Sequence, residues 1–215
     1  MHNATMMRHK AALRARALAQ RDALGGDERR RANMAITARV LALLARSGPA
    51  VVLAYASFGS EFSTADFIGA VLDAGHTLAL PRIDRETRRL GLYRVSEPAA
   101  QLVAGRWGIA EPDPARCAAV DLSSLDFVLV PGVVFDRAGG RIGYGGGFYD
   151  KLFADCGAQG RTPLKVAPAF ACQVVDTVPV EPHDVPVDHV VTEQVSHPKL
   201  AHRGAAAREC LTHSD

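Results

Sequence analysis

Short apolar runs alternate with helix-forming segments along the chain, and this alternation restricts the possible folds most strongly. Asp126 to Val130 (DFVLV) is the clearest run, and Ala50 to Ala54 (AVVLA) is a second. Continuous apolar runs of this length are typical of strands buried on both faces, as in parallel sheets covered by helices. Shorter candidate strands are Thr77 to Leu80, Leu90 to Val95, Lys165 to Ala167 and His189 to Thr192. The pattern predicts an α/β fold, a layered and mainly parallel sheet with helices on both faces.

The segments between these runs have the composition of helices. Residues 10 to about 24 are good helix formers, and Gly25-Gly26 ends this segment. At about 100° per residue, Lys10, Arg14 and Arg21 fall within about 40° of one another and form one basic stripe. We expect a second helix up to Gly48-Pro49, a third from near Thr64 to Gly75, and a chain break at Pro81-Arg82.

Composition excludes several classes of protein. With 215 residues, 48% hydrophobic and 22% charged, the chain has the profile of one globular domain. A net charge of +2 gives no global field that would favour nucleic acid or a membrane surface. No run of about 18 apolar residues occurs and the start lacks the apolar centre of a secretory signal, so we expect a cytoplasmic protein. The scattered cysteines contain no CxxC pair and predict neither a disulfide framework nor a zinc site.

We expect a single domain from residue 10 to residue 193. Residues 1–9 are expected to form a disordered extension. Residues 194–215 are polar and lack an apolar period, and we expect them to form a flexible tail.

A glycine-rich segment, Val130 to Leu152 (VPGVVFDRAGGRIGYGGGFYDKL), carries the most chemical information. Glycines occupy positions 143, 145, 146 and 147 between a predicted strand and a predicted helix. Glycine permits positive φ, so consecutive N–H groups can turn toward one anion, and the helix N-terminus adds its dipole. The segment matches neither the Walker pattern nor the dinucleotide fingerprint. A tight turn is therefore the alternative to a phosphate site.

The residues that flank the glycines favour the phosphate interpretation. Arg141 supplies a fixed cation on one side. Tyr149 and Asp150 follow on the other side, where Mg²⁺ accompanying a triphosphate would need an oxygen ligand. The alternative for Asp150 is a carboxylate that caps the helix or complements its dipole.

This segment resembles the signature of the 5-formyltetrahydrofolate cyclo-ligase family. The family pattern is a Pro-Gly-x-x-Phe-Asp turn followed by Arg-x-Gly-Tyr-Gly-Gly-Gly-Tyr-Tyr-Asp. The chain departs from the second run once, with Phe148 in place of the first tyrosine of the Tyr-Tyr pair. This departure keeps an aromatic ring but removes a hydroxyl.

Other stretches resemble the same family in order and spacing. They are Lys10-x-x-x-Arg14, Tyr55 to Thr64 (YASFGSEFST) with Glu61, Leu80-Pro81-Arg82, Trp107-Gly108-Ile109-x-Glu111-Pro112, Ala169-Phe170-x-x-Gln173, Val180 to Asp188 with Asp184, and Val191-Thr192-Glu193. Taken singly, each has a simpler interpretation: a solvated basic face, a helix-capping acid at Glu61, core packing of Trp107, or an exposed loop acid at Asp184. Together they extend the resemblance from about residue 10 to residue 193.

The resemblance implies an activity and a set of site residues. It implies ATP- and Mg²⁺-dependent conversion of 5-formyltetrahydrofolate to 5,10-methenyltetrahydrofolate, ADP and phosphate, by phosphorylation of the formyl oxygen and attack by N10. The partners would be these small molecules, with no nucleic acid or membrane, and the protein a monomer. The implied fold is a Rossmann-like α/β architecture similar to ribose-5-phosphate isomerases and CoA transferases.

The implied roles fall into four groups. They are ATP binding by Lys10, Arg14, Arg141, Gly143, Tyr144, Gly145, Gly146, Gly147, Phe148, Tyr149 and Asp150; substrate binding by Ser57, Glu61, Trp107 and Phe148; catalysis by Arg141 and Tyr149; and metal binding by Asp150 and Asp184.

Two other functions stay open at this point. A relative with the same ATP site could act on another substrate, because glycines and aspartates recognise nucleotide rather than folate; Glu61 and the Trp107 region argue against this. A non-catalytic binding module would tolerate loss of the metal carboxylates, yet Asp150 and Asp184 are both present.

Overall fold

The central sheet explains how distant segments meet. The computed structural model describes residues 2–105 and 108–198. Within them, the largest sheet has seven strands in the order β12-β11-β9-β6-β1-β2-β3. Its strands are β1 (Val51–Leu53), β2 (Thr77–Asp84), β3 (Arg89–Arg94), β6 (Phe127–Leu129), β9 (Leu164–Pro168), β11 (His189–Val191) and β12 (Ser196–Pro198). The pairs from β2 through β11 are parallel, whereas β3 and β12 add antiparallel edges.

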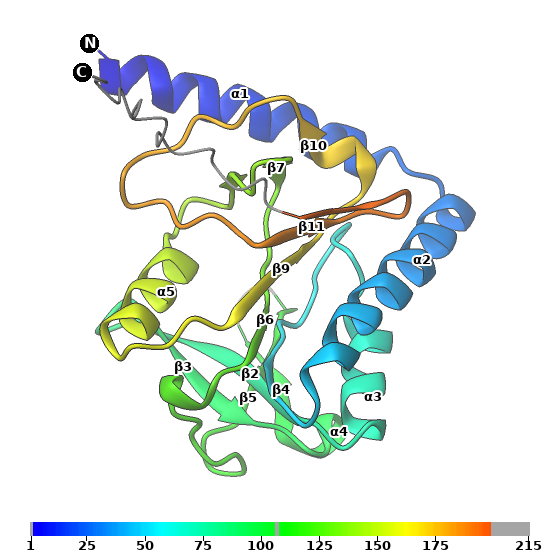
Figure 1. Cartoon of the computed structure of the whole chain (residues 1–215), viewed down its shortest axis with the longest axis vertical. Coiled ribbons are helices and arrows are strands. Elements are labelled where there is room, and N and C mark those ends of the chain that lie inside the picture. The colour runs from blue at the N-terminus through cyan, green and yellow to red at the C-terminus, as the bar shows by residue number, and fades with distance from the viewer. Residues whose placement is uncertain (1, 106–107, 199–215) are drawn as a thin grey trace, which may run out of the picture.

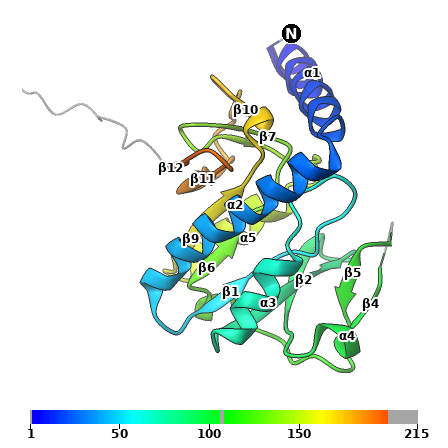
Figure 2. The same ribbon diagram turned by 90° about the vertical axis from the view of Figure 1, so that its right-hand side faces the viewer.

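Helices cover both faces of this sheet, as predicted. Successive residues of a strand point to opposite faces, so Val52 packs in one core cluster and Leu53 in another. α2 (Gly26–Leu44) and α3 (Ala65–Asp73) cover the Val52 face. α5 (Phe148–Ala158) covers the Leu53 face. Figure 1 shows α5 on one side of the central strands with α2 and α3 on the other, and Figure 2 looks onto α2 and α3 with α5 behind.

A smaller sheet supports the first helix. β7 (Val134–Asp136) lies between β8 (Arg141–Ile142) and β10 (Val174–Val175). α1 (His2–Asp22) buries Ala17 in a cluster with Val133, Val134, Ile142 and Val178 of this region, and it runs across β7 and β10 in Figure 1. The remaining short elements are η1 (Ala45–Ser47), α4 (Pro98–Gln101), β4 (Leu102–Ala104), β5 (Ala110–Pro112), η3 (Leu122–Ser124) and η4 (Ala171–Gln173).

The structure corrects three predicted boundaries. α1 begins at His2, so residues 2–9 are helical rather than disordered, because residues such as Ala4, Met6 and Met7 favour helix. β12 lies in the segment predicted as a flexible tail and pairs with β11. Strand pairing uses backbone hydrogen bonds, so the polar side chains of this segment do not prevent it. Residues 199–215 lie outside the described part of the chain.

The third correction concerns Pro81-Arg82, where β2 continues as far as Asp84 instead of breaking. β1 ends at Leu53, whose partner is Ala79, so Pro81 lies beyond the β1 ladder. Val95 donates its N–H to Leu78, and by the alternation of an antiparallel ladder Pro81 occupies a position without a β3 hydrogen bond. The proline therefore costs the sheet no ladder bond.

The helices of the described residues include none with the length and apolar character needed to cross a lipid bilayer.

Candidate functional site

Glu61 is a buried carboxylate in the loop between β1 and α3. Its side chain is 7% exposed. Tyr144 of the glycine segment donates its hydroxyl to Glu61 Oε1 at 2.9 Å, and the N–H of Phe58 donates to Oε2 at 3.1 Å. Burial raises the pKa of Glu61, while the hydrogen bonds from Phe58 and Tyr144 and the charge of Arg21 oppose the rise. The structure thus brings Glu61 together with the glycine segment.

The loop that carries Glu61 is held in shape by its own hydroxyls. Ser57 Oγ accepts the N–H of Thr64 at 3.2 Å, and Thr64 Oγ1 accepts the N–H of Ser57 at the same distance. Thr64 also donates to the Tyr55 carbonyl at 2.7 Å. Ser57, predicted to bind substrate, therefore already bonds within the loop.

Arg21 is a residue of this region that sequence analysis placed on the basic stripe but did not assign to the site. It is 4% exposed and lies near the end of α1. Its Nε donates to Ser60 Oγ at 2.9 Å, and one terminal nitrogen donates to Tyr144 Oη at 3.1 Å. Tyr144, predicted among the ATP-binding residues, therefore has its hydroxyl between Arg21 and Glu61.

The glycine segment adopts backbone conformations that require glycine. Gly145 has φ of 100° and Gly147, the residue before α5, has φ of 65°. At Gly146 a Cβ atom would lie 2.5 Å from the Phe148 ring, so that ring packs closely on the loop. The segment is a glycine-dependent turn that ends at the N-terminus of α5, as the sequence predicted.

Arg141 and Asp150 form an ion pair at the start of α5. The distance between Arg141 Nη2 and Asp150 Oδ1 is 2.7 Å, and the Arg141 side chain is 7% exposed. Arg141 also donates to the carbonyl of Val185, and the N–H of Val185 donates to Asp150 Oδ1 at 3.0 Å. Asp150 Oδ1 therefore accepts hydrogen bonds from Arg141 and from the Val185 N–H.

Lys10 bridges two carboxylates at the other end of the chain. Its Nζ lies 2.8 Å from Glu181 Oε2 and 3.0 Å from Asp184 Oδ2. Burial alone would lower the pKa of Lys10, but hydrogen bonds to and charges on Glu181 and Asp184 outweigh it and raise that pKa. Burial likewise would raise the pKa of Asp184, but hydrogen bonds from the Glu181 backbone and Lys10, with nearby positive charge, lower it.

Arg14 lies one helical turn from Lys10 and contacts the glycine segment directly. Its Nε donates to the carbonyl of Gly143 at 2.9 Å. The predicted pair on the first helix is therefore brought against the glycine segment and the Asp184 loop, two segments more than 120 residues away in sequence.

Glu181 is a second residue that sequence analysis passed over. Potential ligand atoms of Glu181, His183 and Asp184 lie within 4.8 Å of one another, and carboxylate oxygens suit Mg²⁺. Asp150 is not in this group of the described residues, although Val185 connects its Oδ1 to the same loop. The signal in the sequence was the closely spaced Glu181 and Asp184, of which only Asp184 was selected.

Tyr149 has a buried hydroxyl with no hydrogen-bond partner among the described residues. Burial raises its pKa above the ordinary value, as does the charge of Glu61, while Arg141 opposes the rise. The phenol is thus neutral and near both of these charged groups. Trp107, predicted to bind substrate, lies outside the described residues.

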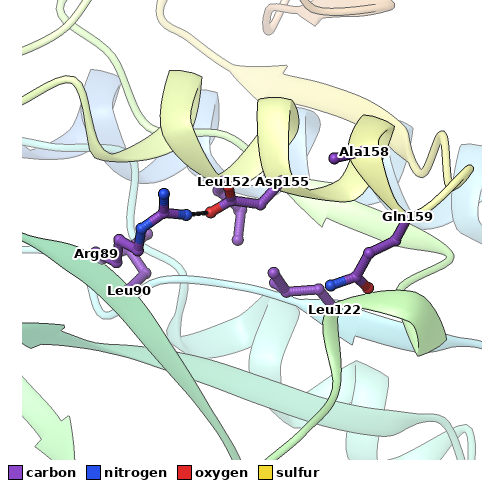
Figure 3. A pocket seen from close by; sticks show the side chains of 7 residues that line it. All are labelled: Arg89, Leu90, Leu122, Leu152, Asp155, Ala158 and Gln159. Carbon is purple, nitrogen blue, oxygen red and sulfur yellow. Dashed lines mark hydrogen bonds and ion pairs between the residues drawn. The ribbon is translucent and has the colours of Figure 1, made fainter. Parts of the chain in front are cut away.

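A separate cavity of about 320 Å³ lies between α5, β3 and η3. Arg89 and Asp155 form an ion pair across it, and Gln159 lies at the other end, as Figure 3 shows. None of the predicted site residues lines this cavity.

Comparisons with known proteins show the family of this chain. The model of the 5-formyltetrahydrofolate cyclo-ligase family matches residues 6–193. A Mus musculus 5-formyltetrahydrofolate cyclo-ligase is 30% identical over 86% of this chain and 93% of its own length, and an Escherichia coli K12 protein of the same name is 35% identical over 67% of this chain and 81% of its own. The NMR structure of Aquifex aeolicus 5,10-methenyltetrahydrofolate synthetase has a TM-score of 0.76 and 31% identity, covering 94% of this chain and 99% of that one. The chain belongs to the 5-formyltetrahydrofolate cyclo-ligase family.

Proposed function

We propose that this chain converts 5-formyltetrahydrofolate to 5,10-methenyltetrahydrofolate, using ATP and Mg²⁺ and releasing ADP and phosphate. The observation that carries the proposal is the 2.9 Å hydrogen bond from Tyr144 to Glu61. It joins the loop proposed to hold folate to the segment proposed to hold phosphate, so the two substrates would meet at this point. We call the Glu61 loop the folate end, and Lys10, Arg14, Arg141, Gly143–Gly147, Asp150 and Asp184 the phosphate end; Tyr144 connects the two.

At the folate end, Glu61 has capacity left for a ligand. A carboxylate offers about four lone-pair positions, and Tyr144 and Phe58 each occupy one. The two that remain suit a flat pair of N–H donors such as the pterin ring presents. Ser57, Trp107 and the ring of Phe148 complete the proposed folate contacts.

At the phosphate end, backbone and cationic donors converge on the turn. Gly145 and Gly147 have positive φ, and the N-terminus of α5 follows directly. The amides of Gly143–Gly147, with Tyr144, Phe148 and Tyr149 in the same turn, would hold the phosphates together with Arg14 and Arg141. Lys10 would turn from Glu181 and Asp184 toward phosphate once a metal ion balances those carboxylates.

The residues present fit a magnesium ion by their donor chemistry. Asp184 lies beside Glu181, and Asp150 has one oxygen, Oδ2, outside the hydrogen bonds that hold its Oδ1. Asp150 and Asp184 would hold the ion, which when bound neutralises phosphate charge. Asp150 also pairs with Arg141, and Asp184 with Lys10.

The chemistry requires positioning more than bond-making by the protein. The γ-phosphoryl moves to the formyl oxygen, N10 attacks the formyl carbon, and the oxygen leaves as part of phosphate. Arg141, held by Asp150, would face the negative charge of the transferred phosphoryl group. The neutral Tyr149 hydroxyl, which has no protein partner among the described residues, would donate to an oxygen of the reacting group.

The test is the growth of methenyl-folate absorbance when purified protein is mixed with 5-formyltetrahydrofolate, ATP and Mg²⁺. Controls omit ATP, omit Mg²⁺, or replace ATP with a non-hydrolysable analogue. Growth only in the complete mixture supports the proposal. Absence of growth, with ATP binding still seen by calorimetry, would mean that the substrate is not this folate.

A further inference from the structure

Arg21 is a buried cation that has no carboxylate partner in the described part of the chain. It is 4% exposed, and none of the ion pairs between described residues includes it. Its side chain donates to the neutral hydroxyls of Ser60 at 2.9 Å and Tyr144 at 3.1 Å. Burying a guanidinium is costly unless a negative group compensates its charge. The question is therefore which negative group compensates the charge of Arg21 through the hydrogen-bond network.

The hydrogen-bond directions answer that question. Arg21 donates to Tyr144 Oη, and Tyr144 uses its own proton to donate to Glu61 Oε1 at 2.9 Å. The cation and the carboxylate are therefore joined through one hydroxyl, which polarises the Tyr144 proton toward Glu61. The positive charge of Arg21 stabilises the carboxylate through Tyr144. Because Arg21 does not itself donate to Glu61, the remaining acceptor positions of Glu61 stay open.

The same arginine is fixed in place by its surroundings. Arg29 of α2 donates to the Arg21 carbonyl at 2.7 Å and to the Ser60 carbonyl. Ser60 in turn donates to Asp22. α1, α2 and the Glu61 loop thus meet at one point, where the Arg21 side chain contacts the loop through Ser60 and Glu61 through Tyr144.

We propose that Arg21 is a positioning residue for the folate half of the reaction, which acts through Tyr144 to keep Glu61 ionised and oriented toward the pterin. This inference rests on the proposed function and adds to it a residue that contacts neither folate nor ATP. The charged and titratable groups that face Glu61 are Arg21 from α1, Tyr144 and Tyr149 from the glycine segment and α5, and Tyr55 from the loop after β1. The three tyrosines have raised pKa values, so they stay neutral where Glu61 titrates.

The sign of the pH effect follows from these charges. Burial raises the pKa of Glu61 and Arg21 opposes that rise, so removing Arg21 lets the pKa rise further. Glu61 would then be protonated at a higher pH, and the protonated acid is a poor acceptor for two N–H donors. Loss of Arg21 therefore weakens folate binding most on the acid side and least at alkaline pH.

The experiment measures dissociation constants of 5-formyltetrahydrofolate and of ATP separately, by calorimetry, between about pH 5.5 and 8.5. For Arg21→Met we expect folate binding at neutral pH to weaken about tenfold or more, with ATP binding within about twofold of the unmodified protein. Folate affinity should fall as pH decreases and Glu61 becomes protonated, and we call this part of the profile the acid limb. In Arg21→Met the acid limb should move to higher pH. Arg21→Lys keeps the charge and should leave that limb near its original position.

Two further variants make the result decisive. Arg16→Met removes an exposed arginine of the same helix and should change neither constant. Tyr144→Phe removes the connecting hydroxyl from a side chain that is 47% exposed, and it should move the acid limb in the same direction. The double variant Arg21→Met/Tyr144→Phe should move the acid limb little further than either single variant. Both substitutions break the same connection, from Arg21 through Tyr144 to Glu61. If Arg21→Met does not fold, Arg21→Lys and Tyr144→Phe decide the matter.

Unchanged folate affinity in Arg21→Met, an unmoved acid limb in Tyr144→Phe, or equal losses for folate and ATP would overturn the inference. The proposed function fails separately, if the unmodified protein neither binds 5-formyltetrahydrofolate nor produces the methenyl band.

Discussion

Glu61 and Asp184 are carboxylates at opposite ends of the proposed site, and the protein balances their charges differently. Asp184 touches an ammonium group directly, at 3.0 Å from Lys10, and its pKa is lowered. Glu61 accepts hydrogen bonds from a phenol and a backbone N–H of the described residues, and its pKa is raised. In the proposed site, Glu61 would offer open acceptor positions to folate, whereas Lys10 would leave its carboxylate partners when phosphate binds. Pre-organisation would then lie at one end of the site and exchange at the other.

The largest effect is expected from Asp150→Asn at the phosphate end. The amide keeps a hydrogen bond to Arg141 but supplies no charge to a metal ion, so turnover should fall about 100-fold or more, with folate affinity within about twofold. Steady-state kinetics and folate calorimetry measure the two quantities. Asp155→Asn, on the same helix but paired with Arg89, is the matched control. Equal losses of turnover and folate affinity would contradict the metal assignment.

Glu61→Gln tests the folate end alone. The substitution keeps the shape but replaces one acceptor oxygen by a donor, so folate binding should weaken about 10- to 100-fold while ATP binding stays unchanged. Calorimetry with each ligand measures this, and Glu86→Gln, an exposed acid in the turn between β2 and β3, serves as control. A matching loss of ATP affinity would mean that the two ends are not separable.

Gly145→Ala asks whether the phosphate turn is pre-organised in its backbone. A Cβ at this position meets no atom within 4 Å, so any cost comes from φ of 100°. The free energy of unfolding should fall by about 1 to 2 kcal/mol, measured in urea. Gly143→Ala is the matched control, because it also has open space and its φ is not positive. Equal stabilities of the two variants would show that the turn tolerates side chains.

Lys10→Met tests the exchange at the phosphate end through pH. The lowered pKa of Asp184 stabilises the folded protein above the ordinary Asp value of 3.8, and this is lost as pH falls through the lowered pKa. The raised pKa of Lys10 stabilises it below the ordinary Lys value of 10.5, and this is lost as pH rises through the raised pKa. The variant should therefore be less stable than the unmodified protein within this window, by about 1 kcal/mol or less because the pair is partly solvated.

Urea unfolding at several pH values measures this difference, with Lys151→Met of α5 as an exposed control. The difference should close in acid and in strong alkali. A difference that persists in acid would show that Lys10 acts through packing rather than through its charge.

The smallest effect is expected from Phe148→Tyr, which restores the hydroxyl of the family pattern. Because the Phe148 ring already packs on Gly146, ATP and folate affinities should each change by about twofold or less. Competition binding, with the unmodified protein and the Phe148→Tyr variant measured side by side, can detect a change in affinity larger than twofold. A gain of tenfold would show that the missing hydroxyl had weakened the site.

The sequence predicted the interior of the fold better than its edges. β1 and β6 were recognised because both of their faces are buried and their residues are uniformly apolar. β12 was not, because Ser196 and His197 are polar and the strand forms through backbone bonds to β11. The continuation of β2 through Pro81 depends on where the neighbouring strand ends, which no local pattern contains.

Some residues of the candidate site were predicted from the sequence and others were not. The glycine turn was predicted from its residues and Arg14 from the family resemblance, and the structure places them in contact. The roles of Glu181 and Arg21 depend on which distant residues face them, since exposed acids and helix arginines are common and carry no local mark. Asp150 was placed at the start of α5, but its pairing with Arg141 in this state was not predicted.

The bridge formed by Lys10 has a consequence for synthesis. Lys10 is separated from Glu181 by 171 residues and from Asp184 by 174. At about 5 to 20 residues per second a ribosome needs roughly 10 to 35 s to make that interval, during which α1 has no such partners. A nascent or C-terminally truncated chain would carry the glycine turn without the ion pairs from Lys10 to Glu181 and Asp184. The ion pairs that hold α1 to this last segment can therefore form only after almost the whole domain has been made.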